Sequence, residues 1–250
     1  MTRNFSRFTS TGAILGMFLL GGANASPAAE TWRQSVSAGL TLNQGNSDTL
    51  TVAAGWDATR NKASDTLRLA LDGTYGETDD VTSAQTGTAM VHFRRHLKEM
   101  FVYSGTDVLH DRVADVDSRI ITGLGGGDYL WQSTSSHLSG EAGIGHLWED
   151  AGGETDNYPV FRLALRHERH VGTSARLWGS VEYVPRAEDL GEYLLQAEAG
   201  IEAAISTDLH LRLVVRDRFD SHPPPDTREN DGSVVSGLTW IPGAASGREK

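Results

Sequence analysis

The sequence predicts a transmembrane antiparallel β-barrel of about twelve strands. Three observations predict it: long runs of alternating polar and apolar residues, aromatic residues near the ends of the apolar faces, and an N-terminal export signal ahead of the first run. A tilted strand needs about 9–11 residues to cross a bilayer, whereas strands of soluble sheets commonly have about 5–6. The runs in this chain have the greater length, so we expect them to span a membrane.

Composition excludes several classes of protein. The 250 residues contain no cysteine, which excludes a disulfide scaffold, a zinc ribbon and a cysteine nucleophile. There are 22 basic and 33 acidic residues, for a formal net charge of −11, so nucleic acid is not an expected partner. The length allows one large domain or two small ones.

The first 25 residues have the pattern of a secretory signal peptide. Arg3 and Arg7 precede an apolar run at 12–22, and the small residues at 23–25 form a cleavage pattern. The run is shorter than the ~20 residues that a spanning helix needs. We therefore expect a signal peptide over residues 1–25, a barrel over residues 26–241 and a C-terminal tail over residues 242–250. The expected location is the bacterial outer membrane.

The first two runs predict a hairpin. From Trp32 to Leu42 the even positions are mostly apolar, while the odd positions are small or polar. Turn-forming residues follow at 45–47, and the next run places apolar residues at even positions from Leu50 to Ala58. Alternation with a period of two is typical of a strand whose two faces meet different environments.

The later runs show a sharper contrast between their faces. In the tenth run, odd positions from Leu195 to Ile205 are apolar, and in the eleventh the odd positions from Leu209 to Phe219 are mostly apolar. In the fifth and sixth runs apolar residues fall on both faces, so the pattern does not fix their register. The predicted strands span residues 32–44, 48–60, 65–76, 82–95, 99–110, 117–131, 137–149, 158–170, 175–185, 192–206, 208–220 and 230–241.

The connections between the runs alternate in length. Short connections at 61–64, 132–136, 171–174 and 207–208 alternate with longer acidic or proline-rich connections at 110–117, 150–157, 185–191 and 221–230. Short turns on one side and long loops on the other are typical of outer-membrane barrels with both termini in the periplasm.

A secreted β-sandwich is the alternative fold, because it also alternates polar and apolar residues. Edge strands of soluble sheets are usually shortened or interrupted by charge, whereas almost every run here keeps a continuous apolar face. The mean hydropathy of −0.34 agrees with a barrel, since only alternate residues meet lipid. The aromatic residues expected in two interfacial girdles are Trp32, Trp56, Tyr75, Phe93, Trp148, Tyr183, Tyr193, Phe219 and Trp240.

Several segments resemble a known family. They are residues 37–49, Asp117 to Arg119, the glycines 123, 125 and 126, residues 138–145, and residues 219–225 followed by Asp231. The chain resembles the YdiY-like family of salt-induced outer membrane proteins, a domain of unknown function. The resemblance implies an outer-membrane barrel of a Gram-negative bacterium and carries over no catalytic residue. One departure is that ten residues follow Trp240, whereas barrel insertion signals usually end at an aromatic residue.

Charged residues on the polar faces form the candidate functional site. An acidic row on the tenth run lies beside a basic row on the eleventh, at the spacing of cross-strand ion pairs. These two rows have two possible roles. They create a transverse field that selects polar or ionic solutes, or they fill a narrow lumen and make it rigid. The predicted lumen-lining residues are Asp57, Arg68, Asp72, Arg94, Glu141, Arg162, Arg166, Glu168, Glu182, Glu198, Glu202, Arg212, Arg216 and Arg218.

Other motifs are weaker candidates. His137 and Ser139 share a strand face, an arrangement that some outer-membrane lipid hydrolases use, but spacing identifies no third partner. His167 and His170 are expected on opposite faces, which disfavours metal ligation. The glycine run 123–128 has no strand-to-helix context and is expected to permit bending or close approach. Loop carboxylates that divalent cations would bridge to lipopolysaccharide are Asp79, Asp80, Asp111, Asp115 and Asp117.

We therefore expect a non-enzymatic outer-membrane barrel, acting as a narrow pore for ions or small polar solutes. A lumen-plugged barrel for envelope integrity or salt tolerance is the alternative, and a lipid hydrolase using His137 and Ser139 is a third hypothesis. No cofactor and no metal are expected. The expected partners are outer-membrane lipids, lipopolysaccharide and the barrel-assembly machinery.

Overall fold

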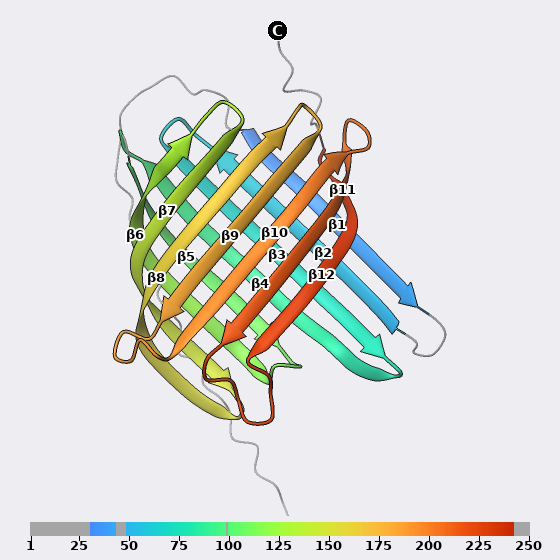
Figure 1. Cartoon of the computed structure of the whole chain (residues 1–250), viewed down its shortest axis with the longest axis vertical. Coiled ribbons are helices and arrows are strands. Elements are labelled where there is room, and N and C mark those ends of the chain that lie inside the picture. The colour runs from blue at the N-terminus through green and yellow to red at the C-terminus, as the bar shows by residue number, and fades with distance from the viewer. Residues whose placement is uncertain (1–30, 44–48, 99, 243–250) are drawn as a thin grey trace, which may run out of the picture.

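Twelve antiparallel strands close into a barrel in the computed structural model, which describes residues 31–43, 49–98 and 100–242 (Figure 1). The predicted signal peptide lies outside the described residues, as does the predicted tail apart from residue 242. The strands are β1 (Thr31–Asn43), β2 (Thr49–Asn61), β3 (Asp65–Thr78), β4 (Val81–His96), β5 (Met100–Asp111), β6 (Val116–Gln132), β7 (Ser136–Ala151), β8 (Glu154–Val171), β9 (Ala175–Pro185), β10 (Tyr193–Ala204), β11 (Leu209–Asp220) and β12 (Asn230–Trp240).

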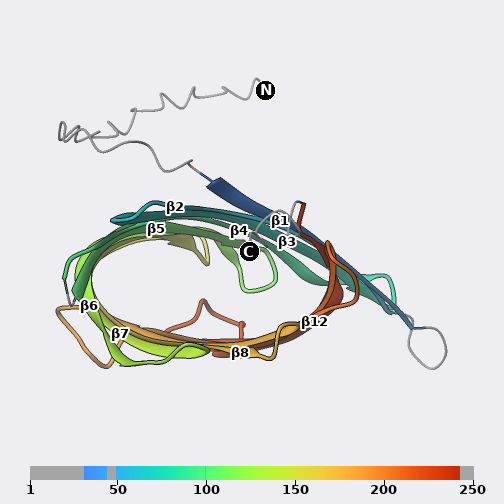
Figure 2. The ribbon, with the colours of Figure 1, turned by 90° about the horizontal axis from the view of Figure 1, so that it is seen from above.

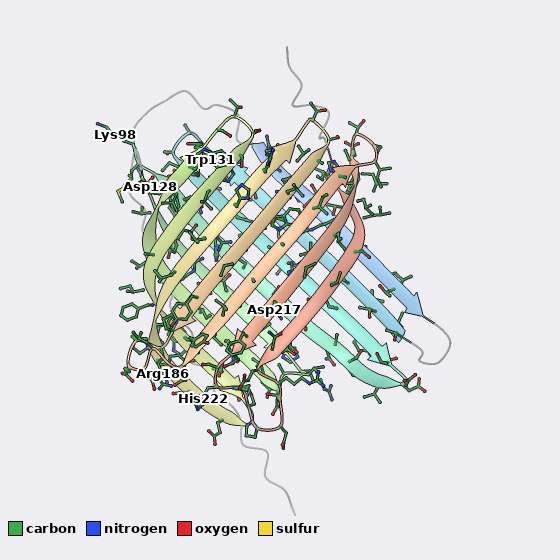
Figure 3. All side chains as sticks on the ribbon, viewed as in Figure 1. Lys98, Asp128, Trp131, Arg186, Asp217 and His222 are labelled. Carbon is green, nitrogen blue, oxygen red and sulfur yellow. The ribbon has the colours of Figure 1, made fainter. Side chains whose placement is uncertain are left out.

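The predicted fold class is confirmed, because each strand pairs with its sequence neighbours and β1 pairs with β12. We call the end of the barrel where β1 begins and β12 ends the terminal end, and the opposite end the loop end. Figure 3 places Lys98 and Trp131 at the terminal end and Arg186 and His222 at the loop end. No helix in the described part of the chain is long and apolar enough to cross a membrane.

Two of the predicted long connections are shorter in the structure, and the first, predicted at 110–117, consists only of residues 112–115 between β5 and β6. Residues 150–157 were expected to form a long connection, but β8 begins at Glu154, and only Gly152 and Gly153 connect it to β7. Polar residues continue the ladder here, for example Glu149 opposite Asp156, because backbone pairing does not require apolar side chains. The connection between β3 and β4 is also short and consists of Asp79 and Asp80. Long connections at the loop end are therefore confined to 186–192 and 221–229 among the described residues.

The strand register assigns one face of every strand to the outside. Large exposed apolar residues such as Leu40, Leu71, Leu163 and Leu213 share a face with one another across the pairings. The opposite face of each strand turns inward and carries the charged residues. In β5 and β6, where the sequence left the register open, Tyr103 pairs with Gly125 on the inner face.

Aromatic residues lie on the outer face near the strand ends. Trp32, Phe93, Trp131 and Trp240 are exposed toward the terminal end. At the loop end the rings of Tyr183, Tyr193 and Phe219 contact in series, with centroids 5.2 and 5.7 Å apart, and Tyr75 and Trp148 are exposed near the loop ends of β3 and β7. Trp56 differs from the prediction, since it lies in the middle of β2 and its Nε1 donates to Gln34 at 3.4 Å. Two girdles flanking an apolar band are typical of transmembrane barrels.

The barrel is flattened in cross-section (Figure 2). Two broad walls therefore face each other, and side chains from opposite walls come within reach of one another. This flattening positions the candidate site.

Candidate functional site: the charged interior

All of the predicted lumen-lining residues lie on the inner faces of their strands. Pairings such as Glu198 with Arg216 and Arg166 with Ser139 place them on the face opposite the exposed leucines. The structure brings most of them into ion pairs, which divide the interior into a packed side and a hydrated side.

On the packed side, Glu141 of β7 is the centre of a buried cluster. Its carboxylate accepts from Arg94 at 2.5 Å and from Arg162 at 2.8 Å, and Arg166 Nε lies 3.6 Å away. The side chain of Glu141 is only 3% exposed. Glu182 of β9 completes the cluster, accepting from Arg162 at 2.6 Å and from Arg166 at 3.1 Å. Two carboxylates thus hold three guanidinium groups, an arrangement that stays stable when buried only if the hydrogen bonds are satisfied.

Aromatic rings extend this cluster. The guanidinium of Arg94 lies 4.0 Å from the centroid of the Phe101 ring, and that of Arg162 lies 5.0 Å from the Tyr103 ring. Such contacts stabilise a cation most where water is excluded. Phe101 is fully buried. The cluster therefore fills the lumen beside β4, β5, β7 and β8.

The inner glycines make room for Tyr103. A Cβ built on Gly125 would lie 2.6 Å from the Tyr103 hydroxyl, and one on Gly143 would also collide with it. The Tyr103 hydroxyl is buried without a hydrogen-bond partner. The prediction that the glycine series permits a close approach is borne out.

Toward the loop end, apolar side chains fill the same side. They come from the inner faces of β6 to β10, where the alternation predicted mainly polar residues. The cluster consists of Leu147, Tyr158, Val160, Val184 and Leu194, with Ile121 packed against it.

The hydrated side of the lumen carries charges that solvent reaches. Arg216 of β11 donates to Glu198 of β10 at 2.6 Å, and both side chains are 27% exposed. Arg68 donates to Asp57 at 2.7 Å from the neighbouring strand. The carboxylates of these pairs, Glu198 and Asp57, are more exposed than Glu141, although Arg94 and Arg166 of the Glu141 cluster are as exposed as Arg216.

Within the described part of the barrel, four ion pairs cross the lumen between strands that are not neighbours. Arg94 of β4 pairs with Glu141 of β7, and Arg119 of β6 with Asp220 of β11 at 2.5 Å. From β11, Arg216 reaches Asp72 of β3 at 3.8 Å, and Arg218 reaches Asp111 of β5 at 3.6 Å. The lumen is therefore constricted by contacts from wall to wall. A cavity of about 40 Å³ lies beside Asp72, Arg212 and Arg216.

The predicted basic row on β11 is present, but one pairing differs from expectation. Glu202 lies opposite Arg212 in the register, yet it forms its ion pairs with Arg176 at 3.8 Å and His210 at 3.6 Å. Arg176 also pairs with Glu168. The guanidinium of Arg212 instead lies 5.2 Å from the centroid of the Trp178 ring. Alternation predicted the face of Arg212 correctly but not its partner, because it does not specify rotamers.

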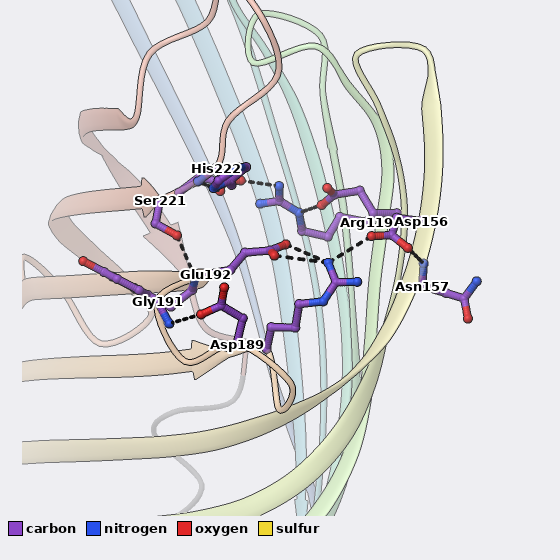
Figure 4. Close-up of polar contacts among 12 residues, drawn as sticks. Arg119, Asp156, Asn157, Asp189, Gly191, Glu192, Ser221 and His222 are labelled. Atoms are coloured by element: carbon purple, nitrogen blue, oxygen red, sulfur yellow. Dashed lines mark hydrogen bonds and ion pairs between the residues drawn. The ribbon is translucent and has the colours of Figure 1, made fainter.

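A second network closes around the loop end (Figure 4). Arg186 donates to Asp156 at 3.1 Å and to Glu192 at 3.0 Å, while Arg119 joins Glu149 to Asp220. Desolvation lowers the pKa of Arg186, but the hydrogen bonds and charges of Glu192 and Asp156 outweigh it and leave that pKa raised. Arg186 therefore stays charged and ties the β9–β10 connection to the rim.

The loop 221–229 leans across this mouth. Pro224 Cβ lies 3.1 Å from where a Cβ on Gly152 would be, although Gly152 belongs to the turn between β7 and β8. Asp111, expected as a loop carboxylate, lies at the end of β5, where it accepts from the backbone of Val113 and Ala114. Asp111 thus belongs to the lumen network. Sequence reasoning missed this role, and that of Arg119 and Asp220, because the pairs join distant strands.

The other motifs are not assembled into sites. His137 and Ser139 are both inward, but no hydrogen bond joins them in the described part of the chain, and the His137 ring contacts Tyr129 with centroids 5.9 Å apart. His167 faces outward and bonds Ser136, while His170 faces inward and pairs with Glu168. The described residues contain no cluster of three or more groups suited to a metal ion.

Comparison with solved structures finds barrels that are similar to this one. Among solved structures, the NanC porin has a TM-score of 0.51 at 7% sequence identity, with 83% of this chain and 98% of that chain covered. The KdgM porin has a TM-score of 0.46 at 8% identity, with 84% and 98% covered. No curated protein matches the sequence. A family model described as a protein of unknown function, DUF481, matches residues 36–240. The chain belongs to this family.

Proposed function

We propose that the protein is a non-enzymatic barrel of the bacterial outer membrane that conducts ions or small polar solutes through a narrow, charged lumen. The outer apolar band with its aromatic rims supports insertion in a bilayer. Closure of the sheet satisfies the backbone hydrogen bonds that lipid leaves without partners. Export by the segment 1–25 and assembly by the barrel-assembly machinery, among lipids and lipopolysaccharide, are parts of this proposal.

The single observation that carries the pore is the hydrated charged column on β11. Its inner face presents His210, Arg212, Arg216 and Arg218 from the terminal end to the loop end. Acidic groups face the column from β10 and from the opposite wall, where Asp72 lies. A permeating ion would thus meet opposite charges on two sides, which is the transverse field of a selective lumen.

The constriction limits what passes. Wall-to-wall ion pairs and a cavity of about 40 Å³ leave room for water and small ions, since roughly 10–15 Å³ of such space holds one water. The proposal is therefore a low-conductance pathway. Large solutes would need the crossing pairs to open.

Planar bilayers test this proposal. Refolded protein should give discrete conducting steps, and the double variant Asp72→Ser/Arg216→Ser should give larger steps because a crossing pair is removed. The control Asp57→Ser/Arg68→Ser removes a pair that joins neighbouring strands on one wall, and should change the steps less. Silence of both the native protein and the Asp72/Arg216 variant would overturn the pore.

A closed structural barrel is the second candidate, and the packed side of the lumen favours it. The Glu141 cluster and the apolar cluster at Leu147 stabilise the barrel without contributing to conduction. In this case the protein would support envelope integrity, or salt tolerance as the YdiY-like resemblance implies. Silent bilayers together with a leaky envelope in a deletion strain would support it. Fatty-acid release that Ser139→Ala abolishes would contradict the non-enzymatic assignment.

A further inference from the structure

The seam between β1 and β12 is the weakest interface of the barrel. Only three residue pairs are in register, from Val36 with Trp240 to Ala38 with Leu238. Every other pair of neighbouring strands in the described barrel aligns nine or more residue pairs, the fewest being between β8 and β9. The closure of the barrel thus depends on a short ladder near the terminal end.

Beyond that ladder the two strands separate. β1 continues to Asn43 in register with β2, and β12 pairs with β11 from Asn230 onward, but neither pairs with the other there. At the point of separation two glycines meet, and a Cβ on Gly237 would lie 3.0 Å from the Gly39 Cα. Figure 2 shows the far end of β1 running out past the ring of strands. Edges left unpaired at membrane depth are unfavourable unless another polar group contacts them.

The lumen reaches the seam from the inside. The cavity of about 40 Å³ is lined by Ser37 and Gly39 of β1 and by Val235 and Gly237 of β12. Asp72, Arg212 and Arg216 line the same cavity. A group held by these charges therefore lies directly behind the gap between β1 and β12.

The charge in the cavity favours an anion. Arg216 already pairs with Glu198 and Asp72. Among the described residues Arg212 forms no ion pair within 4.0 Å: its guanidinium lies over the Trp178 ring, and Glu198, Glu202 and Asp72 act on it only from a greater distance. An anionic group would supply the hydrogen bonds that the Arg212 guanidinium donates, and such charge-assisted bonds are among the strongest available.

The outside of the seam favours a hydrocarbon chain. Leu40 and Val234 are 62% and 68% exposed, and Val36 and Leu238 flank them. These side chains face lipid on both edges of the gap. A polar cavity on one side and an apolar margin on the other match an amphiphile.

We propose that the seam is a lateral portal between lumen and bilayer for an anionic single-chain amphiphile. Its head group pairs with Arg212 in the cavity, and its hydrocarbon chain leaves between β1 and β12. The portal is independent of ion conduction, because a barrel without open-channel current still presents the seam to lipid.

Photo-crosslinking tests the portal in vesicles that contain a fatty acid with a photoreactive group next to its carboxylate. We expect adducts on the inward Ser37 and Val235, about tenfold fewer with Arg212→Gln, and about tenfold fewer when the same chain carries a zwitterionic choline head group. Equal labelling of these residues by both lipids, or no labelling of either residue by the fatty acid, would overturn the proposal.

Closing the seam is the second arm. The chain has no cysteine, so Leu40→Cys/Ser236→Cys places the only thiols on the two edges, where a short bifunctional thiol reagent bridges them. The bridge should abolish the Ser37 and Val235 adducts. The matched control Ala199→Cys/Val215→Cys bridges a fully paired interface and should leave them unchanged. Adducts that persist when the β1–β12 seam is bridged would show that the fatty acid enters elsewhere, and would contradict the portal.

Discussion

Tyr103 is an inner residue whose position depends on neighbouring residues that have no side chain. Its hydroxyl lies against two glycines, Gly125 and Gly143, on the next two strands, and the Arg162 guanidinium lies over its ring. The interior of a close-packed protein has no room for even one additional methyl group at such a contact. Glycine at these positions is therefore a packing requirement of the lumen.

Adding one methyl group at Gly125 should destabilise the barrel. Gly125→Ala brings a Cβ to 2.6 Å from the Tyr103 hydroxyl, so we expect a loss of about 1–3 kcal/mol in the free energy of unfolding. Urea unfolding in lipid vesicles measures it. The control is Gly87→Ala, where nothing lies within 4 Å of the new Cβ. Equal effects of the two substitutions would contradict the packing described here.

Neutralising Glu141 should lower the free energy of unfolding by more than neutralising an exposed acidic residue does. Glu141→Gln leaves the buried Arg162 and the half-buried Arg94 and Arg166 with less compensating charge, and we expect a loss of about 3–5 kcal/mol in the free energy of unfolding. Asp107→Asn is the control, since Asp107 is 44% exposed and its one ion-pair partner among the described residues is His92, and the free energy of unfolding should fall by less than about 1 kcal/mol. The same unfolding experiment compares the two variants. If Glu141→Gln left the free energy of unfolding unchanged, the Glu141 cluster would not be buried as described.

At the scale of elements, the β7–β8 hairpin connects the barrel wall to the mouth. Its turn consists of Gly152 and Gly153, with φ values of 60° and 76°, and a Cβ at Gly152 would lie 3.1 Å from the Cβ of Pro224 in the loop 221–229. The turn therefore both reverses the chain and supports a loop from the opposite side of the barrel.

A valine at Gly152 should release that loop. Gly152→Val places a side chain at positive φ and pushes it against Pro224, whereas Gly172→Val has the same φ within a degree and nothing nearby. Both should lose about 1–2 kcal/mol from backbone strain. Only Gly152→Val should speed proteolysis after Arg228. Equal cleavage rates in the two variants would mean that Gly152 does not hold the loop.

At the scale of the whole molecule, alternation predicted the strands well and the interior poorly. The predicted and observed bounds of β9 are the same at both ends, because alternation with a period of two shows which residues of a strand face lipid. The pairs from Arg119 to Asp220 and from Arg218 to Asp111 were not predictable, since they depend on how far the barrel is flattened. The early start of β8 was missed because polar residues extend its ladder into water.

The sequence also left β5 and β6 undecided, and the reason is physical. Phe101 and Ile121 are apolar residues on inner faces, where they pack the lumen rather than meet lipid. When both faces of a strand meet an apolar environment, one inside the barrel and one outside, the sequence no longer alternates between polar and apolar residues. The same ambiguity in a sequence is therefore a sign of a partly filled lumen.

The central claim is that alternate residues of each strand meet lipid and a hydrated lumen, and a cysteine scan along β11 tests it most directly. Single cysteines at Leu211, Arg212, Leu213, Val215 and Arg216 in a chain without native thiols are exposed to a water-soluble thiol reagent in sealed vesicles. We expect rapid labelling at the even positions and protection at the odd ones. Labelling without this period of two, or with the opposite phase, would contradict the account.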